Sequence, residues 1–145
     1  MQNLFFPLPI LLVLSLLPPR PERAPAAREE PVAVGFDLLA GFDWVEGREL
    51  PAEIRALNGR RVKITGFMRN EEEREHMTWF WIVNQNCDCQ GAPRMNEWVY
   101  GTMPEEEDIS YTDEPVEVTG VLDVGEERNG DRVVSIYRLA IEEVR

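Results

Sequence analysis

Three features of the sequence predict a mainly β domain. Five short segments are rich in apolar residues or alternate apolar with polar residues, and a period of two is typical of strands. Two of these segments share the form Val-x-(Ile/Val)-Thr-Gly, and a glycine within a strand marks a bulge or a tight bend, as small closed sheets need at their corners. A short helical segment precedes the first strand. We therefore predict a small five-stranded Greek-key barrel, OB-like in form, with a short helix before its first strand.

Two short helical elements are predicted in the N-terminal part of the domain. Residues 34–45 carry bulky apolar side chains around Asp37, which we expect to be the N-cap of a single helical turn. Residues 50–59 predict the helix that precedes the first strand, because Pro51 stands at its first position and Gly59 lies just past its end.

The five predicted strands differ in how much of their surface should be buried. In the first, Val62 and Ile64 alternate with polar residues, as in a strand with one buried face. The second is apolar on both faces, so we expect both faces to be covered, and we place Trp79, Trp81 and Trp98 in the core. The strands span residues 61–68, 78–83, 98–103, 115–122 and 132–141.

Residues 1–26 have the composition of a secretory signal peptide. Their apolar run, from Leu4 to Leu17, is shorter than the about 20 residues that a membrane-spanning helix needs, and it suits the central region of a signal peptide. Small residues at Ala24 and Ala26 predict cleavage after Ala26. Because arginines follow the run instead of preceding it, a short uncleaved N-terminal anchor is the alternative.

Cleavage after Ala26 would leave a short linker and one domain. Residues 18–31 are rich in proline and charge, and we expect their last part, residues 27–31, to be a linker. Residues 32–145 are expected to form a single OB-like domain. We expect an exported protein, located in the periplasm or another extracytoplasmic compartment. Contact with a membrane is expected only through an uncleaved leader.

The charge balance narrows the classes of partner. The chain has 15 Lys plus Arg against 27 Asp plus Glu, a net charge of −12. A nucleic-acid groove or a patch for anionic membranes needs clustered positive charge, so neither is expected. The partner that we expect is an envelope protein or a small ligand, which the sequence does not identify.

A polar loop between the second and third predicted strands is the candidate functional site. Loops on a rigid scaffold usually carry such sites. Asn96 is expected to fix this loop by bonding its backbone. The residues that we single out are Cys87, Asp88, Cys89, Asn96 and Glu97.

The cysteine pair has three interpretations that the sequence leaves open. The first is a disulfide, either intermolecular or closed across Asp88; the geometry of so short a loop would suit redox use better than structural use. The second is a site for Cu(I) or Zn(II), in which Cys87 and Cys89 act with His76 or a methionine as ligands. The third is a pair of small loop residues without chemistry of their own.

The residue inventory favours binding over catalysis. His76 is the only histidine, and the chain has no Gly-x-Ser-x-Gly elbow to support a nucleophilic relay. We therefore predict a non-enzymatic binding or accessory module of the bacterial cell envelope, with no cofactor. The alternative is a metal-binding or thiol-redox protein that uses Cys87 and Cys89. A third hypothesis, an oligosaccharide or peptide held on the face of the barrel, comes from fold analogy alone.

The order of short motifs through the domain resembles a known family. These motifs are GFDLL at 35–39, LP at 50–51, LNGRRV at 57–62, ITGFM at 64–68, GAP at 91–93, NEWV at 96–99, PV at 115–116, GVLDVGE at 120–126 and SIYRL at 135–139. Over about residues 34–144 the chain looks like an uncharacterised family of exported bacterial proteins, known as a numbered domain of unknown function. The resemblance implies a secretory leader and one small domain, and it brings no activity, substrate or partner.

Overall fold

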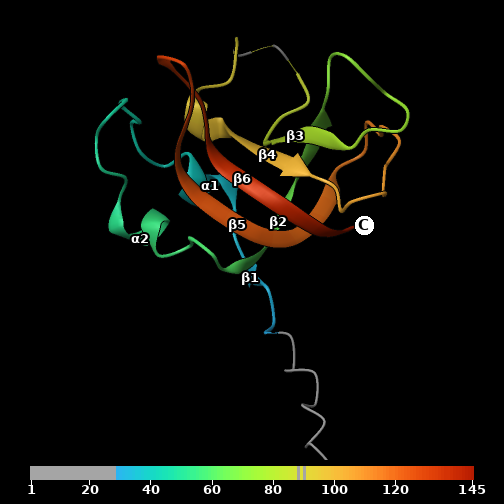
Figure 1. Ribbon diagram of the computed structural model, residues 1–145, viewed down its shortest axis with the longest axis horizontal. Coiled ribbons are helices and arrows are strands. Elements are labelled where there is room, and N and C mark those ends of the chain that lie inside the picture. Colours follow the sequence, from blue (N-terminus) through green and yellow to red (C-terminus); the bar gives the residue numbers. More distant parts are fainter. Residues whose placement is uncertain (1–28, 88, 90) are drawn as a thin grey trace, which may run out of the picture.

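The computed structural model describes residues 29–87, 89 and 91–145 (Figure 1). The signal peptide predicted for residues 1–26, the first part of the linker and Asp88 lie outside these residues. Within the described part of the chain, the model contains no helix with the length and apolar character needed to cross a membrane.

Six strands form one curved sheet whose ring of five closes as an OB-type barrel (Figure 1). The strands are β1 (Val32–Ala33), β2 (Arg61–Arg69), β3 (Trp79–Val83), β4 (Trp98–Thr102), β5 (Val116–Asn129) and β6 (Arg132–Val144). Their order is β1-β2-β3-β4-β6-β5, and β5 also pairs with β2. The β4–β6 pair is parallel, whereas the other four pairs of the ring are antiparallel. This connectivity confirms the predicted OB-like barrel, and all five predicted strands are present.

The glycine of the repeated motif acts as predicted. Gly120 lies next to a register shift between β5 and β6, and a Cβ at this position would meet the backbone of Ala140. Only glycine permits that close approach at the corner where the ring closes.

The N-terminal elements differ from the prediction in detail. Helix α1 (Phe36–Leu39) begins after Gly35, which is its N-cap in extended conformation, so the prediction of Asp37 as N-cap is wrong. Asp37 lies in the first turn instead, and its carboxylate occupies the space where a Cβ at Gly35 would lie. Helix α2 (Ala52–Arg55) follows Pro51, which is the N-cap and not the first helical residue.

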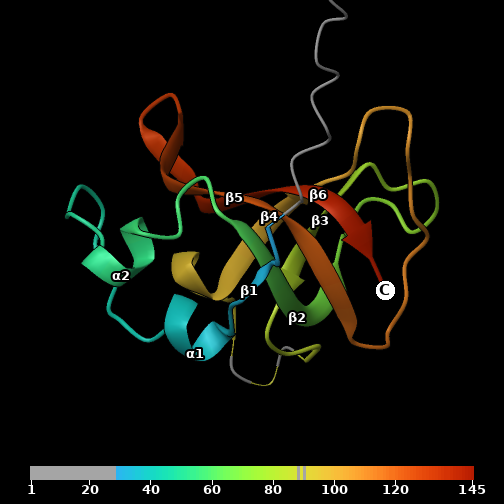
Figure 2. The same ribbon diagram turned by 90° about the horizontal axis from the view of Figure 1, so that it is seen from below.

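Strand β1 adds a sixth strand that the sequence did not predict. It has two residues and runs parallel to β2, with Val32 opposite Val62. Two residues are too few to show a period of two, so only the long-range pairing reveals this strand. The helices α1 and α2 lie at the end of the molecule opposite the C-terminus (Figures 1 and 2).

The barrel interior is filled by apolar side chains from every strand of the ring. At one end, α1 contributes Phe36 and Leu39, and the buried hydroxyl of Tyr137 on β6 donates to the carbonyl oxygen of Leu39 at 2.9 Å. This bond links the first helix, α1, to the last strand, β6. The residues with no exposed surface include Val62, Ile64, Phe80, Ile82, Val99, Val118, Leu122 and Ile136.

Strand β3 is buried along only one face, apart from Val83 at the end of the other face, which corrects our prediction for it. Phe80 and Ile82 point into the core and are fully buried, whereas Trp79 and Trp81 alternate with them and are half-buried. Trp98 on β4 is half-buried as well. The prediction of three core tryptophans is therefore wrong. These side chains are apolar, but the period of two places them on the outer surface of the closed barrel.

Candidate functional site

Four aromatic side chains form a continuous cluster on the outer surface of β3 and β4, which we call the aromatic face. It consists of Trp79 and Trp81 from β3 and of Trp98 and Tyr100 from β4. Trp81 and Trp98 are stacked, with ring centroids 4.4 Å apart and planes 16° apart. Tyr100 lies 5.0 Å from Trp81 and 5.5 Å from Trp79, so each ring contacts at least one other.

The strand register holds these rings in place. Trp81 lies opposite Tyr100, and Trp79 lies opposite Thr102. Cross-strand neighbours on one face are close enough to pack, and aromatic pairs contribute about 0.5–1.5 kcal/mol beyond the area that they bury. Because both strands have hydrogen-bonded neighbours on each side, the aromatic face rests on rigid backbone.

Arginine–carboxylate pairs border the aromatic face on both sides. On β2, Arg69 is the register partner of Trp81, and its guanidinium lies 3.2 Å from the carboxylate of Glu71. On β6, Arg138 is the register partner of Tyr100 and forms a 2.8 Å ion pair with Asp123. The borders therefore offer both donors and acceptors, while the charges of each pair largely offset one another.

Tyr100 is a neutral hydroxyl on this face. Burial raises the pKa of its phenol above the usual value, and the nearby carboxylate of Glu127 raises that pKa further. The aromatic face thus carries an uncharged O–H group at physiological pH.

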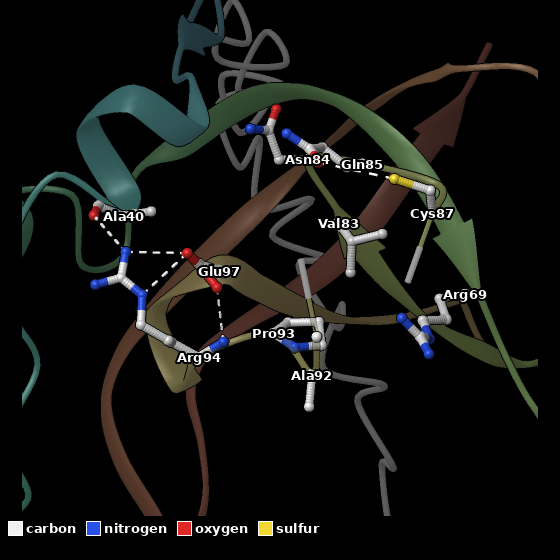
Figure 3. Close-up of a pocket in the computed structure, with 11 residues that line it drawn as sticks. Ala40, Arg69, Val83, Asn84, Gln85, Cys87, Ala92, Pro93, Arg94 and Glu97 are labelled. Atoms are coloured by element: carbon white, nitrogen blue, oxygen red, sulfur yellow. Dashed lines mark hydrogen bonds and ion pairs between the residues drawn. The ribbon is translucent and has the colours of Figure 1, made fainter. Parts of the chain in front are cut away.

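The predicted functional loop lies beside the aromatic face and shapes a pocket of about 220 Å³, which we call the loop pocket (Figure 3). The pocket lies between Ala40, just after α1, and the loop that joins β3 to β4. Arg69 lines the pocket and is also the register partner of Trp81, so the two regions are adjacent. The other residues that line the loop pocket include Val83, Asn84, Gln85, Cys87, Pro93, Arg94 and Glu97.

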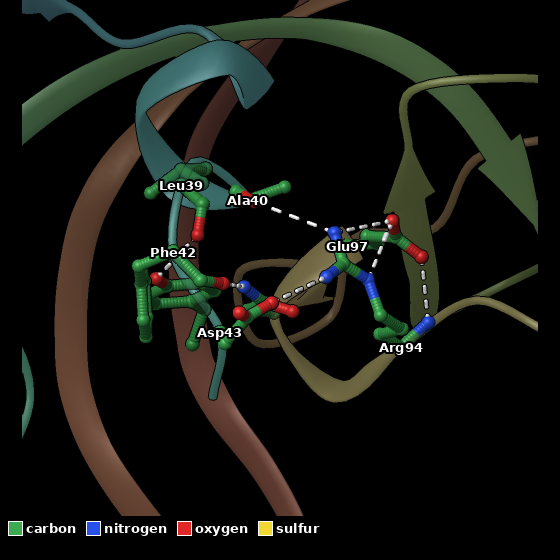
Figure 4. Close-up of polar contacts among 8 residues, drawn as sticks. Leu39, Ala40, Phe42, Asp43, Arg94 and Glu97 are labelled. Atoms are coloured by element: carbon green, nitrogen blue, oxygen red, sulfur yellow. Dashed lines mark hydrogen bonds and ion pairs between the residues drawn. The ribbon is translucent and has the colours of Figure 1, made fainter. Parts of the chain in front are cut away.

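Glu97 and Arg94 hold the short 3₁₀ turn η1 (Met95–Glu97) in a reciprocal pair (Figure 4). The carboxylate of Glu97 accepts from the Arg94 backbone N–H at 2.7 Å and from the guanidinium Nε at 3.0 Å. The backbone N–H of Arg94 holds the pKa of Glu97 below its usual value, and the positive charge of Arg94 adds to that effect. Arg94 also pairs with Asp43 at 3.5 Å. Glu97 is therefore an ionised group that stabilises the loop.

Asn96 connects the loop to the N-terminal arm. It has no exposed surface, and its side-chain N–H donates to the carbonyl oxygen of Phe42 at 2.7 Å. Asn96 thus bonds a backbone group as expected, but of a segment 54 residues away and not of its own loop. Its side-chain oxygen has no partner among the described residues.

Cys87 and Cys89 are joined by a disulfide, with Cα atoms 5.3 Å apart. Both residues are exposed, and Cys87 lies at the wall of the loop pocket. The sulfur of Cys87 lies 4.0 Å from Gln85 Oε1. A disulfide sulfur has no hydrogen to donate, so this is a van der Waals contact. The role of the pair in function stays a prediction, as does that of Asp88, which lies outside the described residues.

His76 lies on the loop between β2 and β3 and pairs with Asp108, Nδ1 to Oδ2 at 3.0 Å. This hydrogen bond raises the pKa of His76, and the carboxylate charge of Asp108 raises it further. Among residues 29–87, 89 and 91–145, no three His, Cys, Asp or Glu side chains converge as metal ligands would. The structure therefore does not bring His76 together with Cys87 and Cys89, and a Cu(I) or Zn(II) site there stays a prediction.

Sequence reasoning missed the aromatic face because it assigned the tryptophans to the core. A usable signal was present in the spacing Trp79-x-Trp81 and Trp98-x-Tyr100. In a strand, residues two apart share a face. Both pairs therefore had to lie on one side of their strands, while Phe80, Ile82 and Val99 lay on the other.

Comparison with known proteins bears on the fold. No protein-family model and no curated protein matches the chain. Among solved structures, a putative aspartyl-tRNA synthetase from Leishmania major Friedlin matches with a TM-score of 0.43 and 12% identity, over 86% of this chain and 22% of that one. A DUF3299 family protein from Pseudomonas aeruginosa PAO1 matches with a TM-score of 0.55 and 19% identity, over 79% of this chain and 95% of that one. The chain therefore shares its fold with a protein of the DUF3299 family, a numbered family of uncharacterised domains such as the sequence resemblance predicted.

Proposed function

We propose that this chain is an exported, non-enzymatic binding module of the cell envelope and that its ligand contacts the aromatic face. The observation that carries the proposal is the contiguous, half-exposed cluster of four aromatic rings on β3 and β4. These are the second and third strands of the five-stranded ring, and OB barrels use the outer face of those two strands to bind ligands. Tryptophan and tyrosine are also the residues that most often dominate binding energies.

The groups around the aromatic face are suited to holding a ligand. Arg138 and Arg69 are each paired with a carboxylate, and Glu97 is paired with Arg94. Ionised groups fixed in pairs supply hydrogen bonds of defined direction, whereas a general acid or base needs a pKa near the working pH. This arrangement supports binding over proton transfer.

The export part of the proposal is supported by the sequence of the leader. The apolar run that ends at Leu17 and the small residues Ala24 and Ala26 fit a cleaved signal peptide. N-terminal sequencing of the protein from envelope extracts tests it. A mature chain that starts at Ala27 is the expected result, whereas a chain that retains Met1 and fractionates with membranes would establish the anchor.

Binding is tested by separating envelope material into polysaccharide, peptide and small-molecule pools and titrating each into the purified domain. Tryptophan emission reports contact directly, because three tryptophans lie on the aromatic face. We expect a saturable change with one pool, which the double variant Trp79→Ala/Trp81→Ala loses. Absence of any response in the wild-type protein, or an equal response in the folded double variant, would overturn the proposed binding function.

Thiol–disulfide exchange is a second candidate, favoured by the exposed Cys87–Cys89 disulfide at the wall of the loop pocket. In that reaction a partner dithiol would give two electrons and two protons to the disulfide and would itself become oxidised. Mass spectrometry after incubation with a dithiol reductant, with and without Zn(II) or Cu(I), tests both this candidate and the metal alternative. Ready gain of two protons or stoichiometric metal supports them, and an unchanged mass removes them.

A further inference from the structure

We infer that the ligand of the aromatic face is an uncharged oligosaccharide whose pyranose rings lie against Trp79, Trp81, Trp98 and Tyr100. This inference rests on the proposed binding function and names the chemical class of the ligand. Four properties of the face carry it: the continuity of the rings, the polar groups on its borders, its charge, and its rigidity.

The rings form a compact cluster that offers several sugar rings a contact surface. The centroids of Trp79, Trp81 and Tyr100 form a triangle with sides of 5.0, 5.5 and 6.2 Å. Trp98 stacks on Trp81 at 4.4 Å. A pyranose ring presents C–H groups on its faces, and such apolar surfaces gain free energy when they leave water for an aromatic surface. Successive sugars can therefore contact neighbouring side chains of the cluster.

The borders match the hydroxyl groups of a sugar. A hydroxyl both donates and accepts a hydrogen bond, so it is best satisfied beside groups of both kinds. The Arg138–Asp123 pair supplies both kinds on the β6 side, and the Arg69–Glu71 pair does so on the β2 side. Thr102, the exposed register partner of Trp79, adds a further hydroxyl.

Charge decides between an uncharged and a charged ligand. The chain carries a net charge of −12, so a nucleic acid or an acidic polysaccharide meets long-range repulsion. On the two borders of the face, the carboxylates that could attract a cationic peptide are already paired with Arg69 and Arg138. Because these arginines are paired with carboxylates and Tyr100 is held neutral, the face itself favours a ligand without charge.

Rigidity lowers the cost of binding. The four side chains pack against one another on paired strands, so few rotamers remain to be ordered when a ligand arrives. Flexible side chains cost about 0.5–1.5 kcal/mol each when an interface immobilises them. A preformed aromatic surface avoids most of this cost, which suits a ligand that gains little free energy per contact.

The test is calorimetric titration of the mature domain with hexasaccharides. The uncharged probes are cellohexaose and hexa-N-acetylchitohexaose, the acidic probe is hexagalacturonate, and a proline hexapeptide stands for the competing class of peptide ligands. We expect saturable binding of at least one uncharged probe, little change between low and high salt, and no binding of the acidic probe. Tight binding of hexagalacturonate, or no binding of either uncharged sugar, would overturn the inference.

Variants locate the bound sugar. Trp79→Ala and Trp81→Ala should each weaken binding at least about tenfold, as truncation of an aromatic hot spot does. Val45→Ala is the matched control, because Val45 is an exposed apolar residue on the loop between the two N-terminal helices. It should leave affinity unchanged. Trp81→Phe, which keeps a ring, guards against a folding defect and should retain more affinity than Trp81→Ala; equal affinity in all variants would refute the site.

The outcomes separate this inference from the proposed function. If the proline hexapeptide or a peptide pool binds in a Trp79-dependent manner and no sugar binds, the inference fails while the aromatic face remains a binding site. If no pool and no probe binds in a manner that depends on the aromatic rings, the proposed binding function fails as well.

Discussion

The aromatic face and the loop pocket are neighbours with opposite construction. The aromatic face stands on regular strands, and its side chains are held by contacts with one another. The loop pocket stands on an irregular segment whose polar residues are occupied in holding that segment: Asn96 bonds Phe42, and Glu97 bonds Arg94. Polar residues in a loop are therefore weak evidence of a ligand site until their structural duties are known. Apolar residues on a strand become evidence of one when the structure leaves them on the surface.

The description of the aromatic face as a surface feature would be wrong if the two sides of β3 contributed equally to stability. Phe80→Ala removes a fully buried ring and should lower the free energy of unfolding by about 3–5 kcal/mol. Trp79→Ala removes a half-buried ring from the aromatic face and should cost about 1 kcal/mol. Urea denaturation of both variants measures the difference. Equal losses would return Trp79 to the core and remove the aromatic face.

Removal of the Asn96 hydrogen bond should have the next largest effect on the free energy of unfolding. Asn96→Ala leaves the carbonyl of Phe42 without this donor and should lower the free energy of unfolding by about 2 kcal/mol. Asn84→Ala, at an exposed position of the same loop, is the control and should be near neutral. Sugar binding measured in the folded Asn96→Ala protein should be unchanged. Selective loss of binding without loss of stability would make Asn96 a ligand residue instead.

The disulfide should have a smaller effect on stability, because it closes a very short loop. Its two cysteines are separated by two positions, and the constraint on the unfolded chain grows with loop length. Cys87→Ser/Cys89→Ser should therefore cost no more than about 1.5 kcal/mol, measured by urea denaturation under non-reducing conditions. A loss of sugar affinity in this variant would contradict the separation of the two regions.

Glu97 should give the smallest effect and a distinctive pH dependence. Its pKa is lowered in the folded state, so its stabilisation is complete above its unfolded value near 4.5 and is lost as pH falls through the folded value. Glu97→Gln should cost about 1 kcal/mol near neutral pH, and the difference from wild type should shrink below about pH 4.5. Thermal unfolding from pH 3 to 7 measures it. A constant difference over that range would show that the carboxylate charge has no part in holding the turn.

Much of the architecture could be predicted because strands leave local signals. The alternation of Val62 and Ile64 with polar residues depends on neighbouring residues alone. β1 could not be predicted in this way, since its two residues become a strand only by pairing with β2. The N-cap of α1 was missed because we assigned that role to Asp37. Its side chain instead lies against the backbone of Gly35, a contact that residue preferences do not predict.

By itself, the sequence determined where the strands run, that alternate residues of β3 point to opposite sides, and that the cysteines share one loop. Only the tertiary structure decided which side of β3 is buried. Both sides are apolar, so the hydrophobic effect favours the burial of either one. The pairing of β5 with β2 closes the ring around Phe80 and Ile82 and leaves Trp79 and Trp81 outside. That closure joins residues 50 to 60 positions apart. The local spacing therefore groups the aromatic residues on one side of their strands but does not reveal that this side is exposed.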